Sequence, residues 1–180
     1  MLQKTLVLIK PDAVKRGLVG EIISRMERVG LKIIDIKLVI PTREFAEKHY
    51  PVTDEWYLKV GNNTIEDCKR YDLDPKEVMG SDDPMVMGKL IHKWNVDFFT
   101  GAKIIAAVFE GIHAIEVARK LAGHTLPLLA SPGSIRGDFS SASALSENSE
   151  KRTILNLIHT SGDEEEAKRE IALWFGKIVE

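Results

Sequence analysis

The sequence predicts an α+β, ferredoxin-like sandwich: a four-stranded antiparallel sheet with helices packed on one face, plus a helical insertion. Three observations lead to this prediction. Short runs of branched aliphatic residues alternate with stretches of helical periodicity. Their order, strand, helix, strand, helices, strand, helix, loop, strand, helix, fits two βαβ-like halves. The 180 residues, 44% hydrophobic and 29% charged, are enough for one domain over 1–180 with a buried core.

Four elements are expected in the first part of the chain: a strand over 2–9, a helix over 17–30, a strand over 31–40 and a short helix over 42–50. The first strand is almost wholly aliphatic and stops at Pro11. The first helix has apolar residues at helical spacing and ends at Gly30, a suitable C-cap. Thr42 supplies an N-cap for the second helix.

Residues 51–97 are expected to form a helical insertion. Three prolines and a polar centre at 61–64 interrupt this segment. Helical pieces are expected over 64–71 and 84–94. Order is favoured over disorder because the segment carries several large aromatic side chains, which gain free energy from burial.

The second part of the chain continues the alternation: a strand over 103–109, a helix over 111–122, a short strand over 155–158 and a helix over 163–175. The last helix opens with acidic residues, which suit the positive end of the helix dipole. Residues 125–150 have no periodicity and are rich in Ser, Gly and Pro. Long loops of this kind in compact domains are usually functional or disordered.

Charge and cysteine content narrow the classes of partner. The net charge of -2 and the isoelectric point of about 6.2 give no indication of a nucleic-acid-binding protein. One cysteine, Cys68, cannot form an intrachain disulfide, which suits a reducing compartment. The apolar stretch 1–9 is too short for a signal peptide or a membrane span. We therefore expect a cytoplasmic protein that needs neither a membrane nor nucleic acid.

Histidine is the first candidate for chemistry. His159 follows the expected strand 155–158 and precedes a turn, a place where scaffolds present reactive groups. A lone histidine is more often a hydrogen-bonded structural residue, and the other four keep that interpretation. They lack the spacing of a metal motif such as H-E-x-x-H.

A phosphate site is the second candidate. Arg136 lies between glycines in the long loop, where the backbone can approach an anion and a guanidinium can grip its oxygens. Arg119 and Thr125 lie upstream, and Lys10 ends the first strand. Neither G-x-x-x-x-G-K-[ST] nor G-x-G-x-x-G occurs, so a P-loop or dinucleotide fold is not expected.

Five motifs together resemble nucleoside diphosphate kinases: Lys10-Pro11-Asp12-Ala13-Val14, Arg16-Gly17-Leu18-Val19-Gly20, Gly133 to Phe139, Asn156-Leu157-Ile158-His159-Thr160-Ser161, and Glu170 to Phe175. The fourth is similar to the family's N-x-x-H-x-S signature. The resemblance runs in order over nearly the whole chain.

The resemblance implies a phosphotransferase that moves the γ-phosphoryl group of a nucleoside triphosphate, such as ATP, to a nucleoside diphosphate by a ping-pong route. The intermediate is a phosphohistidine, placed by this resemblance on the pros nitrogen of His159. Glu170 is similar to the glutamate that fixes the other ring nitrogen. Ser161 resembles the serine behind the histidine, and Tyr50 the tyrosine near the γ-phosphate.

The same resemblance implies the nucleotide contacts. The phosphate-binding side chains correspond to Lys10, Arg119, Thr125 and Arg136, and Asn156 to the asparagine at the sugar hydroxyl. Mg²⁺ is expected to be the cofactor, held by the nucleotide phosphates and water, so no protein ligand is assigned. The family forms hexamers or tetramers, and a homo-oligomer is expected here.

Three departures from the family pattern stand out. The insertion 51–97 is long and contains the position of the base-stacking aromatic, for which Tyr57 is the first candidate and Trp56 and Phe98 are alternatives. A second insertion over about 140–152 is similar to those of archaeal members. Gly162 stands where many members have an acidic residue, whose role Asp163 is a candidate to take over.

Two other functions are compatible with parts of the sequence. A non-catalytic ferredoxin-like nucleotide-binding regulatory module would keep the arginines but has no need for His159, Glu170 and Asn156 together. A nucleic-acid-binding sheet is disfavoured by the acidic balance and by the lack of aromatic residues at strand centres.

Overall fold

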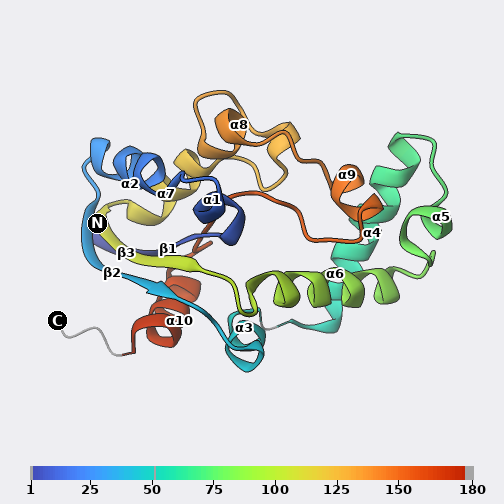
Figure 1. Ribbon diagram of the computed structural model, residues 1–180, viewed down its shortest axis with the longest axis horizontal. Coiled ribbons are helices and arrows are strands. Elements are labelled where there is room, and N and C mark those ends of the chain that lie inside the picture. Colours follow the sequence, from blue (N-terminus) through green and yellow to red (C-terminus); the bar gives the residue numbers. More distant parts are fainter. Residues whose placement is uncertain (1, 51, 177–180) are drawn as a thin grey trace.

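A computed structural model describes residues 2–50 and 52–176 (Figure 1). Its strands are β1 (Leu2–Ile9), β2 (Lys32–Val39), β3 (Ile104–Ile112) and β4 (Ile158–Thr160). Its helices are α1 (Pro11–Lys15), α2 (Val19–Arg28), α3 (Arg43–His49), α4 (Asp54–Arg70), α5 (Pro75–Met79), α6 (Pro84–Phe99), α7 (Ala114–Ala122), α8 (Ile135–Phe139), α9 (Ala144–Ser149) and α10 (Glu164–Phe175), with a 3-10 turn at Pro127–Leu129. Pro51, the first residue of the expected insertion, lies outside the described residues.

The four strands form one antiparallel sheet in the order β2-β3-β1-β4. Central β1 pairs with β3 along its whole length and with β4 only at its end, where Leu8 faces His159 and Ile9 faces Ile158. This register places the end of β1 beside the short β4. The four-stranded sheet of the ferredoxin-like sandwich is therefore confirmed.

Helices cover both faces of the sheet, which corrects the expectation of helices on one face. Val7 and Ile9 of β1 point into a core shared with α2 and α7, and Leu6 and Leu8 point into a second core with α3, α6 and α10. Figure 1 shows α10 and α3 on the side of the sheet opposite to α2 and α7. Because β1 is buried on both faces, its continuous aliphatic run has the pattern of a two-sided core.

The insertion is more helical than the sequence indicated. Its polar centre at 61–64 lies inside α4, a continuous helix that packs along α6. A Cβ on Gly61 would lie 1.9 Å from the carbonyl oxygen of Pro84, and one on Gly88 would lie 2.2 Å from that of Tyr57. The two glycines therefore allow the helix backbones to touch, and this contact outweighs their low helix propensity. Figure 1 shows α4 and α5 beside the sheet, while the end of α6 reaches the sheet, where Val96 and Phe99 join the second core.

The last strand lies further along the chain than expected. β4 covers residues 158–160 instead of 155–158, because pairing with the end of β1 fixes its position. His159 therefore lies within the strand. Short helices α8 and α9 also occupy the segment 125–150, each with a serine N-cap, Ser134 and Ser143. No helix in the described ranges is long and apolar enough to cross a membrane.

Candidate active site

A pocket of about 750 Å³ lies between the β1–β4 end of the sheet and the insertion helices. It joins residues from all parts of the chain. Seven of the site residues expected from the sequence line it: Lys10, Tyr50, Arg119, Thr125, Arg136, Asn156 and His159. Two more, Glu170 and Ser161, lie directly behind it and contact or flank His159.

His159 faces the pocket with one ring nitrogen held from behind. Its Nε2 lies 2.7 Å from Oε1 of Glu170, and its side chain is 24% exposed. With Nε2 as the hydrogen-bond donor to a carboxylate, Nδ1 is the nitrogen with the free lone pair. The pairing therefore defines which nitrogen is available as a nucleophile.

Each carboxylate oxygen of Glu170 has a hydrogen-bond partner, and the side chain is almost completely buried. Its Oε2 accepts a 2.7 Å hydrogen bond from the hydroxyl of Ser161. That hydroxyl in turn accepts from the backbone N–H of Leu6 in β1, at 3.3 Å. Ser161 thus links the last helix to the central strand, and the carboxylate is fixed relative to the sheet.

His49, which the sequence gave no reason to separate from the other histidines, belongs to the same cluster. It is 2% exposed and meets His159 edge to face, with ring centroids 4.8 Å apart. Its Nδ1 accepts a 3.3 Å hydrogen bond from the indole of Trp174 and lies 3.7 Å from Glu170. Burial, with the nearby His159, lowers the pKa of His49 well below its usual value. Only the tertiary packing of α3 on α10 reveals this neighbour.

Lys10 brings a buried ammonium group to the pocket. Its Nζ donates a 2.8 Å hydrogen bond to Oδ1 of Asn156 and is 5.3 Å from the centre of the Phe98 ring. Burial lowers the pKa of Lys10 to about 8, which Asp12 opposes and Arg136 reinforces. An anion that binds next to Lys10 would stabilise the charged form of the ammonium group and raise its pKa again.

Arg136 is fixed by the backbone around it. Its Nε, Nη1 and Nη2 donate to the carbonyl oxygens of Asn156, Gly123 and Ile158, at 3.1, 2.7 and 2.6 Å. Burial, and next the charge of Arg119, lower the pKa of Arg136 to about 10. The guanidinium still has N–H groups beyond these three bonds, and it lines the pocket.

Arg119 and Thr125 form the exposed rim of the same pocket. Asn156 connects this rim to the buried part of the pocket, because its Nδ2 donates a hydrogen bond to the carbonyl oxygen of Thr125 at 2.9 Å. Asn156 therefore contacts both Lys10 and the loop after α7. Together with Lys59 and Arg152, the side chains of Lys10, Arg119 and Arg136 make five cations in the lining of one cavity, which suits a polyanion such as a phosphate chain.

Tyr50 ends α3 and lines the pocket wall beside His49, with ring centroids 4.7 Å apart. Burial, with the carboxylates of Glu170 and Asp12, raises the pKa of Tyr50 above its usual value. Its hydroxyl therefore stays protonated at physiological pH and is available as a hydrogen-bond donor.

Among the three aromatic candidates for a stacking position, Trp56 lines the pocket. Tyr57, the first candidate, is not among the described lining residues, and its ring packs against His92 with centroids 5.8 Å apart. Of these two neighbours, Trp56 is therefore the one in the pocket lining, and the identity of the stacking residue stays a prediction. A helix turns by about 100° per residue, so neighbouring positions face different ways. Phe98 lies beneath Lys10 instead.

The neighbourhood of Gly162 contains two carboxylates with separate partners. Asp163 is the N-cap of α10 and accepts from the backbone N–H of Glu166 at 2.8 Å. Glu166 accepts from the N–H of Gly162 at 2.5 Å and lines the pocket near Arg119. Glu166, which the sequence reading missed, therefore comes to the pocket while Asp163 caps the helix.

The nitrogen and oxygen atoms of His49, His159 and Glu170 all lie within 4.8 Å of one another, a spacing that also suits a metal ion. The contacts favour a hydrogen-bonded cluster instead. Oε1 of Glu170 is already paired with His159, and Nδ1 of His49 already accepts a hydrogen bond from Trp174. Mg²⁺ in particular prefers oxygen ligands.

Comparisons with known proteins agree on one family. The model of the family described as nucleoside diphosphate kinase matches residues 3–58 and 77–178. The nucleoside diphosphate kinase of Pyrobaculum aerophilum is 43% identical over 173 residues, which is 96% of this chain and 94% of that protein. A crystal structure of an NDP kinase from the same organism superimposes with a TM-score of 0.91, at 41% identity, covering 97% of this chain and 96% of the other. A Borrelia burgdorferi nucleoside-diphosphate kinase, a transition-state mimic with vanadate and ADP bound, has a TM-score of 0.76 at 37% identity, covering 97% and 87% of the two chains.

Proposed function

The chain belongs to the nucleoside diphosphate kinase family, and from this premise we propose that His159 carries the phosphoryl group between two nucleotides. The activity is that of a phosphotransferase: a γ-phosphoryl group moves from a nucleoside triphosphate to a nucleoside diphosphate. The observation that carries the assignment to His159 is its half-buried ring, held at Nε2 by Glu170 and open to the cationic pocket at Nδ1.

In the first half-reaction, the lone pair of Nδ1 attacks the γ-phosphorus. The bond to the β–γ bridging oxygen breaks, and the nucleoside diphosphate leaves with the electron pair. A neutral imidazole needs no base for this attack, so orientation is the main demand on the protein. Glu170 supplies it, and its carboxylate also stabilises the positive charge that develops on the ring. A second nucleoside diphosphate then takes the phosphoryl group by the reverse steps.

Lys10, Arg119 and Arg136 bind the phosphate chain in this proposal, with Thr125 at the rim. Charge spreads over the equatorial oxygens of the transferring group in the transition state, and preplaced cations stabilise it. Arg136 is held by three carbonyls and needs little reorganisation. The hydroxyl of Tyr50 is a further donor towards the γ-phosphate.

Asn156 contacts the sugar hydroxyl, next to Lys10, and Trp56 stacks on the base. This places the phosphates at the His159 end of the pocket and the base at the α4 end. Stacking on an indole is tolerant of base identity, because every base has an aromatic face.

We propose Mg²⁺ as the metal that accompanies the nucleotide. The pocket lining is rich in cations and contains few carboxylates, so its donors do not form an oxygen cage for the ion. The fit is instead to an ion held by phosphate oxygens and water, with no protein ligand assigned. An ion bound in this way would neutralise negative charge on the nucleotide phosphates.

A homo-oligomer is proposed from the surface of β2. The outer strand of the sheet exposes Ile34, Ile36 and Leu38, at 41%, 43% and 54%. An apolar outer strand of this kind is a hazard for a monomer unless another chain covers it. We expect a hexamer or tetramer in the cytoplasm, and light scattering measures the mass of the assembly.

A labelling experiment tests the assignment to His159. The enzyme is incubated with γ-labelled ATP and Mg²⁺ and then given GDP. We expect acid-labile, base-stable label on the protein that passes to GDP, and none on His159→Ala. A wild-type chain that takes up no label would favour the non-catalytic nucleotide-binding module. His113→Ala is the matched control, because His113 is exposed and its one ion pair among the described residues is with Glu116, at 3.2 Å.

A further inference from the structure

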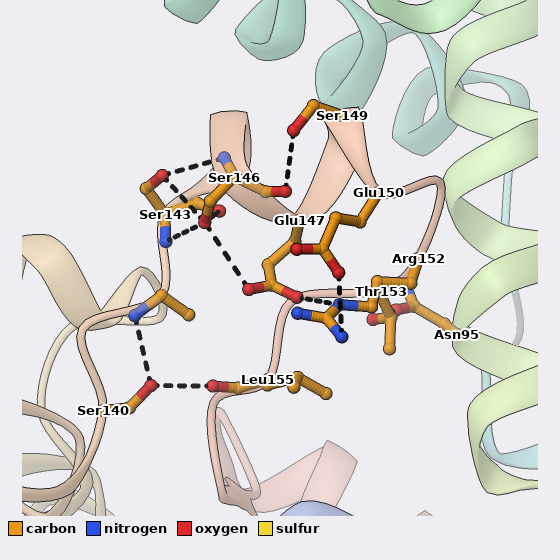
Figure 2. A network of polar contacts seen from close by, with 11 residues as sticks. Asn95, Ser140, Ser143, Ser146, Glu147, Ser149, Glu150, Arg152, Thr153 and Leu155 are labelled. Atoms are coloured by element: carbon orange, nitrogen blue, oxygen red, sulfur yellow. Dashed lines mark hydrogen bonds and ion pairs between the residues drawn. The ribbon is translucent and has the colours of Figure 1, made fainter.

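The cations that line the active-site pocket differ in how they are held. Arg136 donates to three backbone carbonyl oxygens, and Lys10 donates to a side-chain amide. Arg152, which follows α9, pairs with two carboxylates of its own segment, those of Glu147 and Glu150 (Figure 2). Each of these three cations therefore has partners that restrict its orientation.

Arg119 is held differently. It lies in the last turn of α7 and is exposed at the rim of the pocket. Within residues 2–50 and 52–176, no ion pair joins its guanidinium to another side chain. A long exposed side chain loses conformational freedom when it binds a phosphate, unless a neighbour has already restricted it.

The carboxylate of Glu166 lies beside this guanidinium, and both groups line the pocket. A Cβ placed on Gly162 would lie 2.5 Å from Oε2 of Glu166 and 3.4 Å from Nη1 of Arg119. The two charged groups are therefore at most about 6 Å apart, close enough to attract each other strongly at the edge of a pocket.

Gly162 provides the space for this carboxylate. Its N–H donates to Oε2 of Glu166 at 2.5 Å, and the carboxylate occupies the place that a Cβ would need. The backbone N–H of Glu166 is bound in turn by the N-cap residue Asp163, at 2.8 Å. Among the described residues, Oε1 of Glu166 has one ion pair, with Arg169 at 3.8 Å. One oxygen thus anchors the charge to the backbone, next to Arg119.

We propose that Glu166 is a positioning residue for Arg119, whose guanidinium its charge holds at the phosphate end of the pocket before the nucleotide binds. A cation that is already in place stabilises the transferring phosphoryl group without reorganisation. A carboxylate at this place also repels phosphate, so it would only weaken binding if it did not act on a cation. This inference rests on the proposed function, in which Arg119 binds the phosphate chain.

Glu166→Gln separates the charge from the helix cap. The amide oxygen of glutamine still accepts from the N–H of Gly162, so we expect an unchanged Tm. At saturating ATP, phosphoenzyme formation should slow about tenfold, because Arg119 is no longer restricted in advance. The KM for ATP should change less than about threefold, since the loss of this restriction and the loss of repulsion oppose each other.

The background of Arg119→Ala tests whether Glu166 acts through this arginine. Once the guanidinium is absent, Glu166→Gln should have no further effect on the rate. Gly162→Ala should slow the wild type as Glu166→Gln does, because its Cβ displaces the carboxylate, and it should add nothing to Glu166→Gln. Glu165→Gln, a change of the exposed neighbour, is the control and should keep the wild-type rate and KM.

Two results would overturn the proposal. If Glu166→Gln slowed the reaction equally with and without the guanidinium of Arg119, the carboxylate would act on another group. If Glu166→Gln reacted as fast as the wild type or faster, its charge would do no more than repel phosphate. Either result leaves the labelling of His159 intact, whereas failure of the proposed function would abolish the label in the wild type as well.

Discussion

Nε2 of His159 and Oε1 of Glu170 lie 2.7 Å apart, and the carboxylate that makes this contact is 1% exposed. The pairing fixes the ring so that Nδ1 points to the pocket. In Glu170→Gln we expect phosphoenzyme formation to slow about 100-fold, because the amide no longer selects the Nε2–H tautomer and the nucleophile is misplaced. Rapid-quench measurement with labelled ATP gives the rate.

Two controls accompany this change. Ser161→Ala removes one of the hydrogen bonds to Glu170 but keeps the carboxylate, so we expect a smaller loss, about tenfold. Glu165→Gln alters an exposed carboxylate on the same helix and should leave the rate unchanged. Glu170→Gln with a wild-type rate and an unaltered Tm would mean that the orientation of His159 has another source.

The sequence revealed the parts of the site that lie in continuous motifs. Lys10, Arg136 and His159 each stand in a recognisable segment, and the strand patterns brought the segments of Lys10 and His159 to one sheet. The register between β1 and β4 was out of reach, because a strand of three residues has too little periodicity to position it. His49 was missed for a different reason: its place beside His159 depends on the packing of α3 against α10, which no local pattern encodes.

The insertion shows where composition is misleading. A Gly-Asn-Asn-Thr sequence is typical of a turn, yet it lies inside α4. The missing side chain of Gly61 is what the contact with Pro84 requires, so tertiary packing overrides the local preference. Tertiary packing also decides between Trp56 and Tyr57. The way in which α4 docks on the rest of the protein determines which of these two neighbours faces the pocket, and no local sequence pattern shows this.

The ammonium of Lys10 should make nucleotide binding depend on pH. Its pKa of about 8 means that it is charged below pH 8 and progressively neutral above it. A bound phosphate stabilises the charged form and raises this pKa again. We therefore expect the Kd of a nucleoside diphosphate to rise as pH increases through 8, with part of a proton taken up on binding near pH 8.5.

Calorimetry in buffers of different ionisation enthalpy measures this uptake. In Lys10→Arg the group stays charged over the whole range, so the uptake near pH 8.5 should disappear even though affinity also changes. Equal proton uptake by the two proteins would assign the effect to another group.

His49 should make stability depend on pH in the acid range. Its pKa is lowered in the folded state, so the unfolded chain binds a proton that the folded chain does not. The stabilisation is therefore complete above pH 6.5 and is lost as pH falls through that value. Between pH 7.5 and 5.5, the free energy of unfolding should fall by about 1.4 kcal/mol on account of this group.

Urea unfolding of the wild type and of His49→Phe isolates the contribution. The phenyl ring keeps the stacking on Phe99, whose ring is 5.4 Å away, and removes the titration. The difference in stability between the two proteins should change with pH by the amount above. A constant difference would show that His49 titrates alike in the folded and unfolded chains.

The close contact of α4 and α6 should be sensitive to a single methyl group. A Cβ on Gly61 would lie 2.5 Å from the carbonyl carbon of Pro84 as well as 1.9 Å from its oxygen, and backbone has little room to yield. We expect Gly61→Ala to cost about 1–3 kcal/mol of unfolding free energy. Since α4 is a wall of the pocket, the KM for nucleotides should also rise. Gly20→Ala is the matched control: it lies exposed in α2 with nothing within 4 Å, so it should be neutral or stabilise by up to about 1 kcal/mol. If Gly61→Ala instead matched Gly20→Ala in urea unfolding and in KM, the two helices would not be held at the distance that the structure gives them.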